Sequence, residues 1–267
     1  MCRDPAPAVA AHPGPVTPAP VDSLGRRPLA AALEGCGGVF VCLPIASGLR
    51  ERAILRAAEE VAAAVRASGV ARAVWTSSWL ASRAGVRVSP QFDALRDAQQ
   101  AALGAGVPTL VLEPAGYLEN LLTPDSAAAL RAGRLPYTLP ERFAYRWVSA
   151  TDQARVAGAA LAAGSPPHGV HPLGVTRTGG QLAAEVGAGL GRGVRYEEVT
   201  PAAFAELWRP KLGDAADAIA GDCRVIASNP RGLGLEPPPP EAEAFPGVAY
   251  TPIADWAAAS GLLAGVA

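Results

Sequence analysis

The chain has 267 residues, of which 50% are hydrophobic and 18% are charged, and its formal net charge at pH 7 is −1. This length and apolar content suffice to bury a sizeable core and exclude an intrinsically disordered chain. The near-neutral charge, with no basic cluster, argues against a nucleic-acid-binding surface. Apolar stretches end well short of the ~18 residues that a membrane span needs, and the N-terminus lacks the apolar core of a signal peptide. The cysteines follow no disulfide or zinc spacing, so we expect reduced thiols in a cytoplasmic protein.

Residues 1–25 are rich in proline, which predicts an extended segment rather than a helix. Strand and helix patterns then alternate. The predicted elements are a helix at 27–34, a strand at 39–43, a second helix, a strand at 71–77, a helix at 90–103 and a strand at 107–112. The second helix is capped by Ser47 and ended by Gly69, and its apolar stripe is Ile54, Ala58, Val61 and Val65. The continuous apolar run at 39–43 is typical of a strand buried on both faces. This alternation predicts right-handed crossovers and a parallel sheet, hence the α/β class.

The rhythm changes after Pro114. Residues 115–150 carry aromatics, prolines and arginines with little periodicity. The elements predicted beyond them are a helix at 151–163, a strand at 171–175, a helix opened by a capping box at Thr178 and Gln181, a helix after Thr200 and a C-terminal helix after Thr251. We therefore divide the chain into the proline-rich segment 1–25, a sheet-containing core at 26–150 and a mixed region at 151–267, whose helices form a small substrate lobe over the sheet.

Several stretches, taken in order, resemble the NmrA-like family of atypical short-chain dehydrogenases/reductases. The matching stretches are Leu29-x-x-Ala32-Leu33-x-Gly35, Thr76-Ser77-Ser78, Gly106-Val107-Pro108, Glu113-Pro114-x-x-Tyr117-x-Glu119-Asn120, Trp147-Val148 with Asp152-x-Ala154, and Leu190-Gly191-Arg192-x-Val194-x-Tyr196. The resemblance implies a Rossmann-like sheet with a small C-terminal substrate lobe. It also implies NADP(H) as cofactor and NAD(P)H-dependent reduction of a small unsaturated or carbonyl compound, such as a quinone.

The sequence departs from the family pattern in three places. By this alignment it begins at Arg3, where the family's second strand ends, so we expect an N-terminally incomplete sheet. Neither G-x-x-G-x-x-G nor G-x-G-x-x-G occurs anywhere in the sequence, although the pyrophosphate of a dinucleotide needs such a loop. The family's lysine and glutamate on the helix at 90–103 fall at Leu95 and Gln99, and Glu113 stands where arginine is common.

Candidate site residues cluster after the predicted strands, since ligands of open α/β sheets bind at the carboxyl ends of the strands. By resemblance, the catalytic residues are Tyr117 and Ser77, and the substrate-binding residues are Ser78, Trp79, Glu119 and Asn120; the cofactor contacts are Asp22, Pro44 and Pro114. The residues themselves allow alternative roles. Ser77 and Ser78 either hold a carbonyl oxygen or satisfy loop backbone. Tyr117 is either a proton donor or a pocket wall, and Asp22 is either an adenine contact or a capping residue.

Other features carry less chemistry. His168 and His171 form an H-x-x-H pair without a third ligand, so we expect no metal site. The tryptophans are interpreted as core and pocket packing. In the family's strand order, the strand at 39–43 would pair with a strand that precedes this sequence. We therefore expect residues 13–21 to pair with it in part and self-association, as a homodimer, to cover the rest.

Two other kinds of function remain alternatives to the reductase. One is a non-redox enzyme for cyclisation or isomerisation, with Tyr117 and Glu119 as acid and base. The other is a cofactor-free binding or regulatory protein. An enzyme should keep a polar pocket around Tyr117, whereas a regulator should expose an apolar patch.

Overall fold

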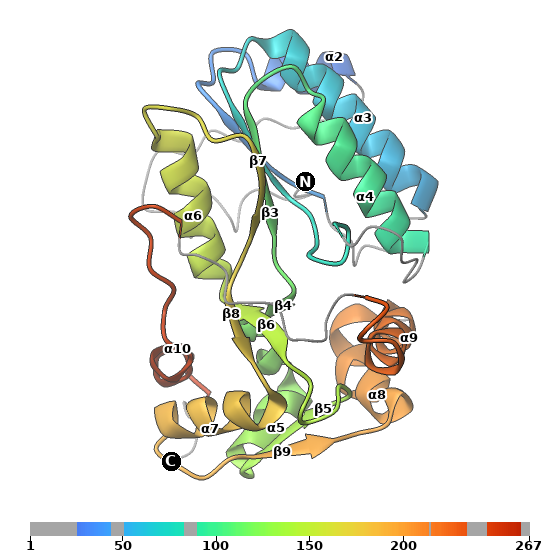
Figure 1. Ribbon diagram of the computed structural model, residues 1–267, viewed down its shortest axis with the longest axis vertical. Helices are drawn as coiled ribbons and strands as arrows, with labels where there is room; N and C mark the ends of the chain where they lie inside the picture. Colours follow the sequence, from blue (N-terminus) through green and yellow to red (C-terminus); the bar gives the residue numbers. More distant parts are fainter. Residues whose placement is uncertain (1–25, 44–50, 83–89, 214, 234–244, 263–267) are drawn as a thin grey trace.

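The computed structural model describes residues 26–43, 51–82, 90–213, 215–233 and 245–262, which form two lobes (Figure 1). The upper lobe is built on a four-stranded parallel sheet with the order β1-β2-β3-β7. Its strands are β1 (Val39–Cys42), β2 (Ala73–Thr76), β3 (Thr109–Glu113) and β7 (Gly169–Pro172). The expectation of an α/β fold with a parallel sheet is confirmed.

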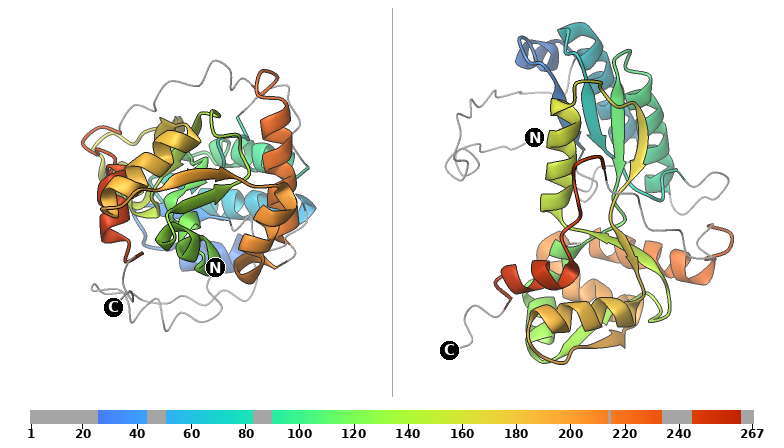
Figure 2. Two further views of the ribbon diagram at one scale, coloured as in Figure 1. Left: turned by 90° about the horizontal axis from the view of Figure 1, so that it is seen from below. Right: turned by 60° about the vertical axis from the view of Figure 1, so that its left-hand side comes forward.

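Helices cover both faces of this sheet. Helices α3 (Glu51–Ser68) and α4 (Pro90–Leu103) lie on one face, with α2 (Arg26–Ala32) beside α3, and α6 (Ala150–Ala162) lies on the other (Figures 1 and 2). The predicted apolar stripe of α3, which runs from Ile54 to Val65, is buried against the sheet. Gly69 ends this helix with a φ of 77°, in the left-handed region where glycine costs least. The crossovers therefore form where the sequence pattern predicts them.

The burial predicted for 39–43 is wrong on one face of β1. Val41 is buried against α3, but Phe40 on the opposite face is 42% exposed and Cys42 is exposed. On that face, α6 packs mainly against β2 and β3. Phe40 is therefore left at the uncovered margin, although an apolar run gives no sign of which face a helix will miss. The other expected cover, residues 13–21, lies outside the described residues.

The lower lobe holds two small sheets and most of the remaining helices. Its sheets are β4-β6-β8 and β5-β9, from strands β4 (Gly116–Tyr117), β5 (Arg134–Tyr137), β6 (Tyr145–Val148), β8 (Val175–Arg177) and β9 (Arg195–Glu198). Its helices are the 3-10 helix η2 (Leu118–Leu122), α5 (Pro124–Arg131), α7 (Gly179–Gly189), α8 (Pro201–Leu212), α9 (Ala215–Ser228) and α10 (Ile253–Ala259). The capping box predicted at Thr178 and Gln181 opens α7. An aromatic core that includes Trp79, Tyr145 and Trp147 holds this lobe together.

The predicted strand at 171–175 is two strands in different lobes. β7 ends at Pro172 in the upper sheet, and β8 begins at Val175 in the lower one. Gly174 lies between them with a φ of 95°, and a Cβ atom there would come within 2.3 Å of the Trp147 carbonyl oxygen. Only glycine fits this close approach, so the chain changes sheets at Gly174.

Two further features bear on the sequence expectations. Among the described residues, none of the helices combines the length and the hydropathy needed to cross a membrane.

Cys36 and Cys42 are exposed free thiols, and Cys223 is a buried one. Burial raises the pKa of Cys223 to about 12, so this thiol stays protonated and inert at neutral pH.

If self-association uses the β1 margin, a charge there should disrupt it. We expect Phe40→Lys to lower the apparent mass measured by light scattering at high protein concentration, because an inserted charge blocks edge pairing. Stability should change little, since Phe40 is already largely exposed. Val170→Lys is the matched control, because Val170 is 41% exposed on β7 at the opposite end of the described sheet. An equal effect of both variants, or a wild-type protein that stays monomeric, would contradict this expectation.

Candidate functional site

The register of the parallel sheet brings the carboxyl ends of its strands together. Cys42 of β1 pairs with Thr76 of β2, which pairs with Leu112 of β3. These strands therefore end at one edge of the sheet, which faces the lower lobe (Figure 1). This is the edge at which open α/β sheets bind their ligands. Ser77 directly follows β2, and Tyr117 lies in β4, shortly after β3.

A chain of hydroxyl, amide and hydroxyl groups runs across this edge. The Tyr117 hydroxyl donates to Gln153 Oε1 at 2.6 Å, and Gln153 Nε2 donates to Thr76 Oγ1 at 3.1 Å. These side chains come from β4, α6 and β2, and Gln153 is only 8% exposed. Burial raises the pKa of Tyr117 above its ordinary value of 10, and the nearby Cys42 and Glu119 raise it further. The phenol is therefore neutral throughout the physiological pH range, and its single hydrogen atom is donated to Gln153.

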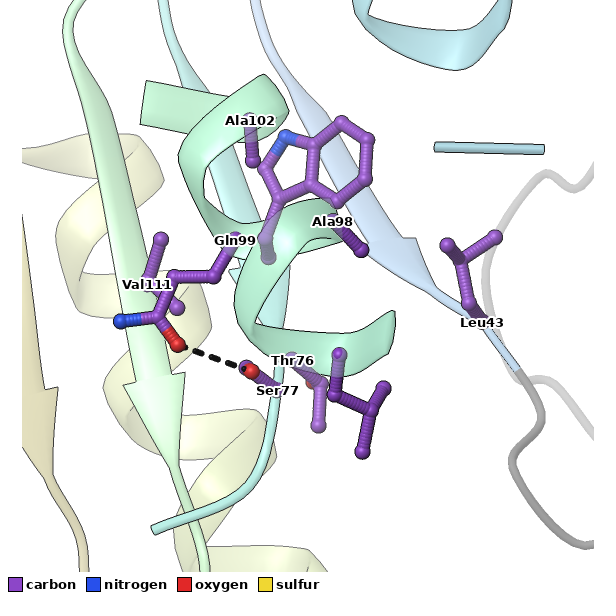
Figure 3. A pocket seen from close by; sticks show the side chains of 9 residues that line it. Leu43, Thr76, Ser77, Ala98, Gln99, Ala102 and Val111 are labelled. Atoms are coloured by element: carbon purple, nitrogen blue, oxygen red, sulfur yellow. Dashed lines mark hydrogen bonds between the residues drawn. The ribbon is translucent and has the colours of Figure 1, made fainter. Parts of the chain in front are cut away.

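Ser77 belongs to a second polar chain, on the opposite face of β2. Its hydroxyl donates to Gln99 Oε1 at 3.0 Å (Figure 3), and Gln99 Nε2 donates to Ser82 Oγ at 2.9 Å. Ser82 in turn donates to the carboxylate of Glu113. Because successive side chains of a strand point to opposite faces, Ser77 faces α4 whereas Thr76 faces α6. The structure thus places the two candidate catalytic residues, Ser77 and Tyr117, in separate networks.

The space beside Ser77 is small. A cavity of about 10 Å³ lies between β2 and α4 (Figure 3), which is room for about one water molecule. Its lining residues are Leu43, Trp75, Thr76, Ser77, Leu95, Ala98, Gln99, Ala102 and Val111. Pockets for small organic ligands are usually at least about 300 Å³, so this cavity does not hold one. Leu95 only fills space in this wall, as its side chain predicts.

The proposed substrate-binding residues after β2 have structural partners. Trp79 is completely buried, with its ring 6.0 Å from that of Tyr145 and 5.6 Å from the Arg146 guanidinium. Ser78 Oγ accepts from the Leu80 backbone N–H at 3.4 Å. Trp79 has no surface left for a ligand in this structure, and Ser78 satisfies loop backbone.

Of the residues after β3, Glu119 ties three elements together. Its carboxylate, on η2, accepts from the Ala150 N–H of α6 at 3.0 Å and from Trp256 Nε1 of α10 at 3.3 Å.

Asn120 is half-buried, and its side chain makes no hydrogen bond to the described residues. Of the proposed cofactor contacts, Pro114 is buried and its carbonyl accepts from the Trp79 N–H, while Asp22 and Pro44 lie outside the described residues.

The first turn of α6 positions Gln153. Ser149 caps the helix by accepting from the Asp152 N–H at 3.0 Å. The Asp152 carboxylate, in a residue only 1% exposed, accepts from the Thr251 N–H at 2.9 Å and the Thr251 hydroxyl at 2.8 Å. Arg155 forms an ion pair with the same carboxylate at 3.0 Å. The turn that carries Gln153 is therefore fixed to the C-terminal part of the chain.

Sequence reasoning missed Thr76 and Gln153 as site residues. Thr76 stands in the motif Thr76-Ser77-Ser78, and the alternation of strand side chains was the available signal that it faces away from Ser77. Gln153 carried no signal, because it lies in another predicted region and no pattern reports that α6 faces β4.

The histidines have structural partners as well. His168 Nδ1 accepts from the Thr109 N–H at 3.2 Å, and His171 packs edge-on against Phe245. Within the part of the chain that the structure describes, no cluster of histidine, cysteine, aspartate or glutamate is arranged to hold a metal ion.

No protein-family model and no curated protein matches this sequence. Solved structures do match. An NADPH-dependent quinone oxidoreductase from Escherichia coli, QOR2, complexed with NADPH, is 23% identical with a TM-score of 0.67, and the match covers 97% of this chain and 88% of that one. A nucleoside-diphosphate-sugar epimerase from Staphylococcus aureus is 17% identical with a TM-score of 0.66, covering 88% and 81%. The Citrobacter sp. triphenylmethane reductase complexed with NADP(H) is 14% identical with a TM-score of 0.65, covering 88% and 80%.

This chain has a Rossmann-like fold. It shares that fold with the two reductases above, whose structures contain NADPH or NADP(H), and with the epimerase. At these identities the likeness concerns the fold alone, so the NmrA-like resemblance remains a sequence-based prediction. The site chemistry must be argued from this chain's own residues.

The anchoring of α6 makes a stability prediction. We expect Asp152→Ala to lower the free energy of unfolding by about 2–4 kcal/mol, because it removes a buried carboxylate and leaves two half-buried hydrogen-bond donors of Thr251 without an acceptor. Thermal or urea unfolding measures this change. Asp97→Ala is the control, since Asp97 is exposed on α4 and its loss should cost under about 0.5 kcal/mol. Equal losses in both variants would show that Asp152 does not anchor the helix.

Proposed function

We propose that this chain acts on a small carbonyl or quinone-like compound bound against Tyr117, and that the reaction is an NAD(P)H-linked reduction of the NmrA-like kind. The observation that carries the proposal is the chain from Tyr117 through Gln153 to Thr76 at the ligand-binding edge of a Rossmann-like sheet. A neutral phenol at this edge suits a ligand oxygen, with which it forms a hydrogen bond without paying for a buried charge. The fold shared with two reductases supports the reaction class.

The described residues do not fit the phosphates of a dinucleotide. None of them forms a glycine-rich turn between a strand and a helix, and the helix position where the family has a lysine is filled by the buried Leu95. We therefore assign no step to a cofactor. This observation favours a second candidate, a cofactor-free protein that binds the same carbonyl compound or converts it without redox chemistry.

Titration with NADPH tests the expected lack of phosphate contacts, and turnover then separates the two candidates. We expect a dissociation constant for NADPH of about 100 μM or weaker, against about 1 μM for a site with intact phosphate contacts. The loss of two charge-assisted phosphate hydrogen bonds, each worth about 1.5 kcal/mol or more, weakens binding by about this factor of 100. Isothermal titration calorimetry measures it, with the E. coli quinone oxidoreductase as positive control. A dissociation constant in the low micromolar range would overturn this expectation. Oxidation of NADPH by duroquinone at saturating NADPH supports the reductase, and its absence supports the cofactor-free protein.

Removal of the Tyr117 hydroxyl tests the site itself. We expect Tyr117→Phe to weaken binding of duroquinone about tenfold, the effect of one lost hydrogen bond, and to lower stability by about 1 kcal/mol. Tyr196→Phe is the matched control, because the Tyr196 hydroxyl also donates at 2.6 Å, to the Leu139 carbonyl in the lower lobe. Both variants should lose similar stability by thermal melting. Unchanged duroquinone binding in Tyr117→Phe would remove Tyr117 from the site.

A further inference from the structure

The hydrogen-bond direction at Tyr117 conflicts with a carbonyl ligand. A phenol has one hydrogen, and here it is donated to Gln153 Oε1. The Tyr117 oxygen therefore presents only lone pairs to a ligand, and a carbonyl oxygen also has only lone pairs. In this arrangement Tyr117 can accept from an alcohol or hydroquinone but cannot donate to a ketone or quinone.

The row of hydrogen bonds from Tyr117 through Gln153 to Thr76, here called the reversible chain, can reverse its donor–acceptor direction without losing a bond. Gln153 lies between two hydroxyls, and a hydroxyl can donate or accept. The terminal amide of Gln153 turns about a torsion whose preferences are broad and nearly two-fold, so it can rotate by half a turn. After this rotation, Thr76 would donate to Gln153 Oε1. Gln153 Nε2 would then donate to the Tyr117 oxygen, which frees the phenolic hydrogen. Among the described residues, the Thr76 hydroxyl donates to no other acceptor, so it is available for this role.

The second polar chain shows what prevents such a reversal. Gln99 also lies between two hydroxyls, those of Ser77 and Ser82. Ser82, however, donates to the Glu113 carboxylate, which can only accept. If the Gln99 amide reversed, Ser82 would have to abandon that carboxylate to donate to Gln99. The chain at Ser77 is therefore fixed in direction, whereas the chain at Tyr117 ends at an uncommitted hydroxyl.

We propose that Gln153 is a reversible positioning residue, which presents Tyr117 as an acceptor in the structure described and, after its amide turns over, as a donor to the carbonyl oxygen of a ligand. The proposal rests on the proposed function in one respect, that the ligand carries a carbonyl. In the reversed chain, the Gln153 N–H also faces the phenolic oxygen, where it stabilises negative charge and makes Tyr117 a stronger acid. The same site then recognises both a quinone and its hydroquinone by reversing one amide.

Two substitutions at position 153 give opposite expectations. In Gln153→Glu at about pH 8 the carboxylate accepts from both hydroxyls, so the Tyr117 hydrogen stays committed. Gln153→Leu removes the acceptor and leaves that hydrogen free for a ligand. We expect Gln153→Glu to weaken duroquinone binding at least about tenfold and to leave binding of durohydroquinone, a donor, within about threefold of wild type. We expect Gln153→Leu to keep duroquinone binding within about threefold of wild type.

These affinities are measured anaerobically by fluorescence titration without cofactor, and Gln99→Glu is the matched control from the fixed chain. A purely structural role for Gln153 predicts the reverse order, because glutamate keeps both hydrogen bonds and leucine loses both. Duroquinone binding that is as tight in Gln153→Glu as in Gln153→Leu, or tighter, would overturn the proposal. If the Gln153→Glu variant fails to fold, the comparison of Gln153→Leu with wild type decides alone. A structural role for Gln153 predicts weaker duroquinone binding in Gln153→Leu, and a loss of about tenfold or more there would overturn the proposal.

A measurement on the ligand-free protein separates this proposal from the proposed function. If the wild type binds neither probe, the proposed function fails, but the hydrogen-bond direction is still measurable. The ¹³Cζ resonance of labelled Tyr117, assigned with Tyr117→Phe, reports whether the phenol donates. A wild-type shift between those of Gln153→Glu and Gln153→Leu supports two directions in exchange. A wild-type shift equal to that of Gln153→Glu shows a fixed donor and overturns the reversal.

Discussion

The buried carboxylate of Asp152 is the contact on which the arrangement of the site depends. It holds the C-terminal part of the chain through both donors of Thr251, and it belongs to the same helical turn as Gln153. Glu119 adds a second tie, from η2 to the start of α6 and to Trp256 of α10. Since η2 directly follows Tyr117, these two carboxylates fix both ends of the Tyr117–Gln153 hydrogen bond. Small movements of α6 would lengthen that bond, so the packing of α6 sets the geometry of the hydrogen bonds at the sheet edge.

The alternation of side chains along β2 divides the site in two. Thr76 faces α6 and joins the reversible chain. Ser77 faces α4, where it bonds to Gln99 (Figure 3), and joins the chain that ends at Glu113. The apolar cavity beside Ser77 is closed by residues such as Leu95 and Val111, and it has room for about one water. Of the two faces, only the one toward α6 combines a half-buried phenol with an adjustable partner. The site chemistry therefore follows from a strand period of two residues.

Much of the upper lobe could be predicted from the sequence, because its elements depend on local signals. Strands β2 and β3 and the stripe of α3 follow from periodicity, which acts within a few residues. In the lower lobe, the capping box of α7 follows from equally local capping chemistry. Helix α5 had such a signal in Thr123-Pro124, whose threonine caps it, but the aromatic and proline content of 115–150 masked it. The exposure of Phe40 and the break at Gly174 could not be predicted, because each depends on a distant segment: α6 in one case and the Trp147 carbonyl in the other.

The same distinction explains the candidate site. Tyr117 was found because it follows a strand, and position after a strand is a property of the local sequence. Gln153 was missed because its contact with Tyr117 spans 36 positions and arises only from the packing of α6. The three residues of the reversible chain come from β2, β4 and α6, whereas the glycine motif of a phosphate-binding loop occurs nowhere in the sequence. The residues proposed to bind a ligand oxygen are thus distinct from a glycine loop that would hold the phosphates of a cofactor. A loss of phosphate contacts can therefore weaken cofactor binding while the hydrogen-bond chemistry at Tyr117 stays intact.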